Sequence, residues 1–263
     1  MSRLSDVFAR ADGRAALVTY FCAGDPDPET TVEVAVAAAE EGADILELGM
    51  PFSDPAADGV AIQRASERAL EKGMTLRKTL EVARAIRARS PIPIVLFGYY
   101  NPILAYGEDA LCRDAAAAGI DGLLVVDLPP EEVKPLRTPA NRAGLAFVPL
   151  VAPTSSEPRI DLAASVADAF IYYVSLTGVT GAASANFAEA AKRAQLVKQR
   201  TKKPVVVGFG VSSGKDVAQL ARVADGVVVG SALVKAVESA ADRASAIDNV
   251  RVLVRDLVSG LRG

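Results

Sequence analysis

The sequence contains no histidine, the side chain whose charge changes most readily near neutral pH. Proton transfer in that range must therefore fall to carboxylates, tyrosines, lysines or the two cysteines. Glu47 and Asp58 lead this short list. Glu47 belongs to the apolar run Asp44-Ile45-Leu46-Glu47-Leu48-Gly49, where an ionised carboxylate is costly to desolvate. The folded protein must therefore either pair the Glu47 carboxylate with another group or use it in its chemistry.

Cysteines and long apolar runs are also scarce. Cys22 and Cys112 lie far apart and outside any Cys-x-x-Cys pair, so we expect buried reduced thiols, with no disulfide framework and no metal site. No apolar stretch reaches membrane-spanning length, and residues 1–8 alternate charged with apolar side chains. These features predict a soluble, cytoplasmic protein that does not enter a membrane.

Aromatic residues make up only 5% of a chain that is 51% hydrophobic. The core must therefore consist of Ala, Val, Leu and Ile, a mix typical of parallel sheets covered by helices. A net charge of -3 without a dense Lys/Arg stripe argues against a nucleic-acid partner. We therefore expect a protein that acts on small molecules and does not bind nucleic acid.

One unit recurs along the chain: an apolar run, a turn, and an Ala-rich stretch with helical spacing. Eight runs predict strands, at 15–23, 44–49, 92–99, 122–128, 146–152, 170–176, 204–210 and 226–230. Capping residues predict helices over 28–41, 76–89 and 215–223, whereas Pro135 and Pro139 predict short, broken helices within 130–143.

Eight strands alternating with helices in 263 residues predict an α/β fold, a (β/α)8 TIM barrel. No linker divides the chain, so residues 1–263 are expected to form a single domain. An extra N-terminal helix over residues 2–11 would close the bottom of the barrel, and residues 241–261 would form the last outer helix.

The C-terminal ends of barrel strands are where chemistry is expected, and Glu47, Tyr99, Asp127 and Tyr172 fall there. Glycine-rich turns follow the last three strands, at 177–181, 208–210 and 230–231. Glycines let the backbone approach an anion, and a helix N-terminus favours negative charge. Their joint position is the usual phosphate site of such barrels.

Each residue also has a plainer interpretation. Glu47 could pair with an Arg or Lys of another strand, and Asp58, which precedes Gly59, could shape a turn. Tyr20, Phe97, Tyr99 and Tyr172 could be packing residues, and Asp127 could end the fourth strand.

The segment Leu-Glu-Leu-Gly-Met-Pro-Phe-Ser-Asp-Pro-Ala-Ala-Asp-Gly at 46–59 resembles the signature of the tryptophan synthase alpha subunit family. Gly-Asp-Pro at 24–26, Tyr-Tyr-Asn-Pro at 99–102 and the three glycine-rich turns are similar to that family in order and spacing. The resemblance implies cleavage of indole-3-glycerol phosphate to indole and glyceraldehyde 3-phosphate, a retro-aldol lyase reaction of tryptophan biosynthesis. It also implies that Glu47 is the general acid/base and that Asp58 binds the indole nitrogen.

The resemblance further implies a substrate pocket. Its phosphate contacts would be Gly181, Phe209, Gly210, Gly230 and Ser231, and its indole pocket and lid would comprise Tyr20, Ile62, Phe97, Tyr99, Asp127, Tyr172 and Thr180. Two residues depart from the family pattern beside the acids, because Ala56 replaces a larger aliphatic residue and Val60 replaces proline. Both put the order of the second loop in doubt.

Members of the family pair with a beta subunit that uses pyridoxal phosphate, so the resemblance implies an alpha2-beta2 heterotetramer and no cofactor in this chain. The partner surface would include residues 51–54, 101–102 and 127–129. Three other functions stay open: a different phosphate-handling barrel, a free-standing indole-releasing lyase, and a catalytically silent activator of a beta subunit.

Overall fold

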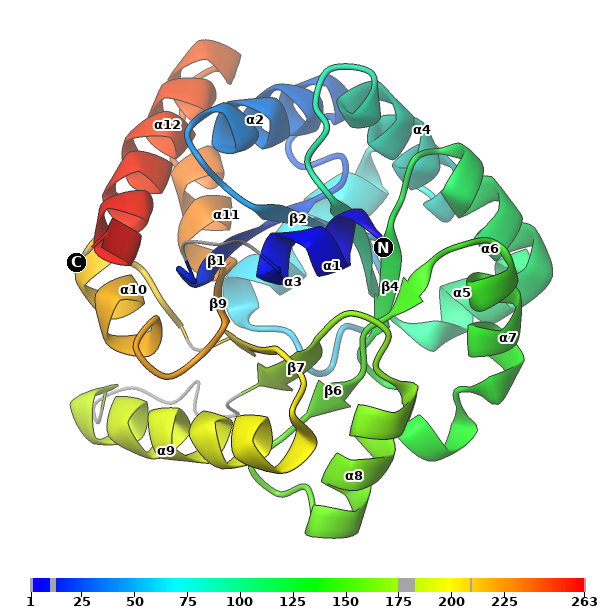
Figure 1. The fold of residues 1–263 in the computed structure, drawn as a ribbon. Coiled ribbons are helices and arrows are strands. Elements are labelled where there is room, and N and C mark those ends of the chain that lie inside the picture. The colour runs from blue at the N-terminus through cyan, green and yellow to red at the C-terminus, as the bar shows by residue number, and fades with distance from the viewer. Residues whose placement is uncertain (1, 10–12, 175–182, 209, 263) are drawn as a thin grey trace.

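The computed structural model describes residues 2–9, 13–174, 183–208 and 210–262, without the side chains of 183–190. Parallel strands form one curled sheet in the order β5-β4-β3-β2-β1-β9-β8-β7-β6, and helices surround it (Figure 1). The strands are β1 (Ala16–Cys22), β2 (Ile45–Gly49), β3 (Ile94–Gly98), β4 (Gly122–Val125), β5 (Ala146–Phe147), β6 (Leu150–Val151), β7 (Ile171–Val174), β8 (Val205–Gly208) and β9 (Gly226–Val229). Every residue of β1 to β4 is buried, as expected for a sheet covered on both faces.

The two ends of the sheet, β5 and β6, are consecutive in the chain. Between them Val148 N donates to Leu123 O at 2.9 Å, and Pro149 O accepts from Tyr172 N at 3.0 Å. Residues 146–151 thus contact β4 on one side and β7 on the other, which closes the sheet into a barrel. The predicted (β/α)8 fold is confirmed, with its fifth strand in two short pieces.

The surrounding helices are α1 (Arg3–Phe8), α2 (Pro28–Glu40), α3 (Val60–Glu71), α4 (Leu76–Arg87), α5 (Tyr100–Tyr106), α6 (Glu108–Ala117), α7 (Lys134–Arg142), α8 (Glu157–Val166), α9 (Ala183–Thr201), α10 (Gly214–Leu220), α11 (Ser231–Glu238) and α12 (Arg243–Ser259), with 3-10 turns η1 (Pro130–Glu132) and η2 (Gly260–Arg262). The predicted caps form: Asp27, Thr75 and Ser213 accept from the backbone of α2, α4 and α10. The segment 130–143 is broken into η1 and α7, as predicted. However, α7 continues through Pro139, because one proline removes a single backbone bond.

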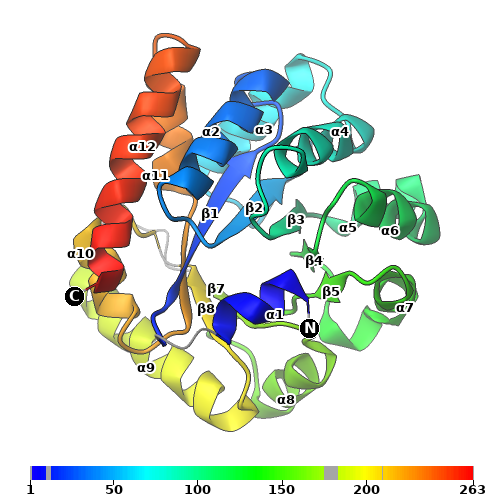
Figure 2. The same ribbon diagram turned by 45° about the horizontal axis from the view of Figure 1, so that its top comes forward.

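Helix α1 lies across the N-terminal end of the barrel, as Figures 1 and 2 show. Its Leu4 is fully buried and reaches the start of β4, where a Cβ on Gly122 would lie 2.8 Å from the Leu4 side chain. Phe8 packs against Phe170 with ring centroids 5.4 Å apart. The extra N-terminal helix therefore closes the bottom of the barrel, as the sequence predicted.

Four aspartates repeat one arrangement at this bottom end. Each lies just before one of the strands β2, β4, β7 and β9, donates its N–H to the carbonyl of a residue in an earlier strand, and accepts that same residue's N–H through its carboxylate. The pairs are Asp44 with Leu17, Asp121 with Ile94, Asp168 with Phe147, and Asp225 with Val205.

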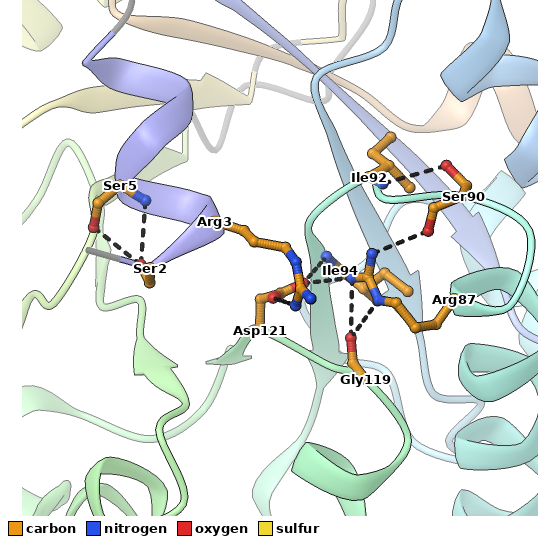
Figure 3. A network of polar contacts seen from close by, with 9 residues as sticks. All are labelled: Ser2, Arg3, Ser5, Arg87, Ser90, Ile92, Ile94, Gly119 and Asp121. Atoms are coloured by element: carbon orange, nitrogen blue, oxygen red, sulfur yellow. Dashed lines mark hydrogen bonds and ion pairs between the residues drawn. The ribbon is translucent and has the colours of Figure 1, made fainter.

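Each of these carboxylates also pairs with a cation. The cations are Arg14 on Asp44, Arg3 and Arg87 on Asp121, Arg137 on Asp168, and Lys198 on Asp225. Figure 3 shows the Asp121 network, in which Arg87 also donates to the carbonyl of Gly119. Each of these four carboxylates thus accepts a backbone N–H group and also pairs with a cationic side chain.

Candidate active site

A cavity of about 390 Å³ opens among residues of the central strands and the loops that follow them. This volume is in the range of small-molecule sites. Nine of the residues singled out from the sequence line it: Tyr20, Glu47, Asp58, Ile62, Phe97, Tyr172, Gly210, Gly230 and Ser231. Thr180, Gly181 and Phe209 lie outside the described residues.

Glu47 lies in the middle of β2, in register with Tyr20 of β1 and Val95 of β3. Its side chain lines the cavity, yet the residue is only 1% exposed. Among the residues that the structure describes, Oε1 has no hydrogen-bond partner and no cation pairs with the carboxyl group. Burial raises the pKa of Glu47 to about 8. The ion-pair interpretation of Glu47 therefore finds no support in this part of the chain.

Asp58 lies at the end of the loop between β2 and α3, hereafter loop two (residues 50–59). Burial raises its pKa to about 6, although a hydrogen bond from the Tyr99 side chain lowers the pKa. The backbone of Asp58 does shape a turn, since its N–H donates to Pro55 O at 3.0 Å. Its carboxylate nevertheless does not cap α3, whose N-cap is Gly59 without a side-chain bond. Asp58 instead lines the cavity.

Two of the sequence-derived residues lie just outside the cavity lining. The Tyr99 hydroxyl accepts from Ala57 N at 3.1 Å, and its ring stacks on Phe52 with centroids 5.2 Å apart. Asp127 accepts from Tyr100 N at 2.8 Å and lines a neighbouring depression. Tyr99 therefore contacts loop two, whereas Asp127 contacts the start of α5.

The aromatic walls depend on glycines that sequence reasoning did not single out for this purpose. A Cβ on Gly49 would lie 2.2 Å from the Tyr20 hydroxyl oxygen, and one on Gly208 would lie 2.4 Å from that of Tyr172. Tyr20 also packs edge-on against Phe97, with centroids 5.3 Å apart. Apolar residues complete the lining: Val126, Leu150, Ala152, Val174, Val211 and Val228. The result is a largely apolar space suited to a flat ring.

Backbone donors lie next to the aromatic wall, because a Cβ on Gly230 would lie 3.5 Å from the Tyr20 side chain and 3.6 Å from that of Ile62. Gly230 precedes the eight-residue helix α11, which begins at Ser231 and has no side-chain cap. Gly210 has a φ of +54°, and a Cβ there would meet nothing within 4 Å. Gly59 approaches the same place, since its Cβ would lie 3.8 Å from Ser231 Oγ. Free N–H groups at a helix start favour an anion such as phosphate.

The two acids differ in protonation near neutral pH. With a pKa of about 8 Glu47 holds its proton at pH 7, whereas Asp58, with a pKa of about 6, is mostly ionised. Burial raises the pKa of Tyr20 and Tyr172 well above the usual value, so both stay neutral. The cavity thus holds a proton donor and a fixed negative charge on adjacent elements, a division of roles that acid–base catalysis requires.

Residues 8–261 match the family model described as the tryptophan synthase alpha chain. A tryptophan synthase alpha chain of Geobacter sulfurreducens is 52% identical over 240 residues, which cover 90% of this chain and 91% of the relative. This chain belongs to the tryptophan synthase alpha chain family. The crystal structure of the alpha subunit from Legionella pneumophila str. Paris has a TM-score of 0.91 at 35% identity, covering 100% of this chain and 99% of that one.

A structure of Mycobacterium tuberculosis tryptophan synthase gives a TM-score of 0.90 at 41% identity, covering 100% of this chain and 99% of the matched chain. The resemblance in the motifs is therefore confirmed along essentially the whole chain. The reaction of the tryptophan synthase alpha chain is the cleavage of indole-3-glycerol phosphate to indole and glyceraldehyde 3-phosphate, a lyase step in tryptophan biosynthesis. The family normally pairs with a beta subunit, which holds the pyridoxal phosphate.

The described part of the chain holds neither a metal-ligand cluster nor a membrane-spanning helix. No group of three or more His, Cys, Asp or Glu side chains there is arranged to hold a metal ion. None of the helices described is both long enough and apolar enough to cross a bilayer. Cys22 and Cys112 are buried free thiols.

Proposed function

We propose that Glu47 is the general acid/base of this lyase and that Asp58 stabilises the positive charge that develops on the indole nitrogen. The protonated carboxyl of Glu47 donates its proton to C3 of the indole ring, which makes the ring nitrogen cationic. The carboxylate then accepts the proton of the glycerol hydroxyl next to the ring. The carbon–carbon bond breaks as the deprotonated oxygen forms a carbonyl group with its carbon. The electron pair of the broken bond moves into the ring and restores the neutral indole. Glu47 ends the cycle protonated again.

The observation that carries this proposal is the state of Glu47: buried in the cavity wall, unpaired among the described residues, and with its pKa raised to about 8. A group with a pKa near the working pH can both give and take a proton. Asp58 has the complementary state, because its pKa of about 6 leaves it charged at pH 7. A fixed carboxylate stabilises a developing cation without reorganisation during the reaction.

The substrate occupies this cavity. Its indole ring lies among Tyr20, Ile62, Phe97 and Tyr172, and its phosphate lies at Gly210, Gly230 and Ser231. The family resemblance adds Gly181 and Phe209 to the phosphate contacts and Thr180 to the lid. Tyr99 and Asp127 act from outside the cavity, through loop two and the start of α5.

This chain assembles with a beta subunit into an alpha2-beta2 complex, and the pyridoxal phosphate belongs to the partner. Loop two and residues 101–102 and 127–129 form the contact surface. Adding a purified beta subunit should then raise the rate of indole formation. An unchanged rate in a complex that demonstrably forms would contradict this coupling.

Indole release from indole-3-glycerol phosphate tests the catalytic assignment. The purified chain should produce indole, and Glu47→Gln should reduce kcat by about 1,000-fold while substrate still binds. Asp58→Asn should also lose most of its turnover, because the amide carries no charge. If both variants kept the original kcat, the proposed roles would be wrong.

A further inference from the structure

Asp58 lies at the end of loop two, much of which is exposed to solvent. Ser53, Asp54, Ala56 and Ala57 are exposed, so few buried side chains anchor the loop. A carboxylate that stabilises a transition state must nevertheless stay in a fixed position, since a displacement of about 1 Å can cost on the order of 100-fold in rate. The loop therefore needs tethers, and the structure shows two.

The first tether is Tyr99, whose hydroxyl accepts from Ala57 N and hydrogen-bonds the Asp58 carboxylate. The second tether is Gln63, in the first turn of α3. Its carboxamide Nε2 donates to Asp58 O at 2.9 Å and more weakly to Pro55 O at 3.4 Å. The Gln63 backbone N–H donates to Gly59 O at 3.0 Å, so both parts of this residue contact loop two.

We infer that Gln63 is a positioning residue, which fixes Asp58 by holding its backbone carbonyl against α3. Gln63 is not among the residues that line the cavity, so it acts on the substrate only through Asp58. Tyr99 holds the carboxylate end of Asp58, and Gln63 holds its main chain. With both ends fixed, few torsions remain for the side chain between them. This inference rests on the proposed role of Asp58.

The role differs from ordinary helix capping. A capping side chain accepts from the free N–H groups at the start of a helix, whereas the Gln63 amide donates to carbonyls upstream of it. Gln63→Glu therefore separates the two roles: it should preserve a role that only stabilises the start of α3, but it should disrupt a role that positions loop two. A glutamate in the first turn favours the helix dipole and leaves the helix intact. It cannot donate to the two carbonyls when ionised, so it releases the loop.

The test compares Gln63→Glu, Gln63→Met and a control, Glu67→Met, which changes an exposed residue one turn further along α3. Gln63→Glu should lower kcat for indole release by about 10-fold to 100-fold, and Gln63→Met somewhat less. KM should change less than kcat, because the backbone donors at Gly230 and Ser231 are untouched. The Tm of Gln63→Glu should stay near that of the original chain, and the control should keep both kcat and Tm.

An unchanged kcat in Gln63→Glu, or a loss of kcat that only follows a loss of folded protein, would overturn the positioning role. Asp58→Asn, measured in parallel, separates the two possible failures. If Asp58→Asn loses turnover while both Gln63 variants keep it, the positioning role alone is wrong. If Asp58→Asn keeps full turnover, the proposed role of Asp58 is wrong.

Discussion

Two buried carboxylates, Asp121 at the N-terminal end of the barrel and Glu47 in the cavity wall, differ in whether a cation pairs with them. At the N-terminal end Asp121 is 7% exposed, accepts from Ile94 N, and pairs with Arg87 at 2.6 Å and Arg3 at 2.9 Å. In the middle of β2, in the cavity wall, Glu47 is 1% exposed and has no cation beside it in the described part of the chain. The paired acids stabilise the strands they join. The unpaired acid costs stability once it ionises, and that cost is what makes it reactive.

Ionisation of Glu47 should lower the stability of the folded chain more than any of the substitutions below. Its folded-state pKa of about 8 lies above the ordinary value of 4.5, so the folded chain retains a proton that the unfolded chain releases. The stabilisation is fully present below pH 4.5 and is lost as the pH rises through 8. Relative to Glu47→Gln, the free energy of unfolding should fall by on the order of 5 kcal/mol across this window. Urea unfolding at several pH values measures the difference, and parallel pH curves for the two proteins would contradict it.

Asp121→Asn should lower the free energy of unfolding without changing turnover. The amide can still accept from Ile94 N, but it leaves Arg87 without its counter-charge, and breaking a buried pair costs about 3 to 5 kcal/mol. Turnover per folded molecule should stay unchanged, because Asp121 lies at the opposite end of the barrel from the cavity. Urea unfolding and active-site titration check the two halves of this prediction. A loss of kcat in fully folded protein would contradict the separation between the ends.

Tyr99→Phe should have a smaller effect at the C-terminal end. The ring can still stack on Phe52, but the hydroxyl bonds to Ala57 and Asp58 are lost. We expect kcat/KM to fall about 10-fold. The Tyr99 hydrogen bond lowers the pKa of Asp58, so the acid limb of the pH profile should move to higher pH. An acid limb that stays in place would mean that Asp58 does not set it.

Val60→Pro should have the smallest effect. Val60 is the first residue of α3 and is 67% exposed, and Gly59 before it has φ -71° and ψ 157°, which a following proline accepts. The substitution should raise the free energy of unfolding by about 0.4 to 1 kcal/mol by restricting the unfolded chain. Urea unfolding measures it. A destabilised variant would show that the start of α3 is more tightly packed than the exposure of Val60 indicates.

The sequence contained most of the fold because the barrel repeats one unit. The strands, the capping side chains of α2, α4 and α10, and helix α1 could all be predicted from hydrophobic runs and local turn residues. The split of the fifth strand could not, because it depends on how Val148 and Pro149 reach two different neighbours. The four aspartates at 44, 121, 168 and 225 were visible in the sequence, each just before an apolar run. Recognising their shared role required the pairing of adjacent strands.

For the candidate site, the sequence predicted which residues matter better than how they act. Whether Glu47 had a cationic partner depended on side chains from distant strands. The position of Asp127 depended on local register: Val126 lines the cavity, while Asp127 turns toward the N–H of Tyr100. Gln63 gave no signal, because a glutamine in the first turn of a helix is ordinary until its amide is seen to donate to Asp58 O. Long-range packing and side-chain direction were the missing information.

The protonation state of Glu47 decides whether this residue can give a proton to the substrate. The infrared difference spectrum between the chain and Glu47→Gln, recorded across the pH range, isolates the carboxyl group of this one residue. The protonated carboxyl band should be present at pH 7 and disappear with a midpoint near 8, the pKa that burial gives Glu47. A carboxylate band already complete at pH 6, with a midpoint near the ordinary 4.5, would contradict the account of Glu47 as an unpaired, proton-holding acid.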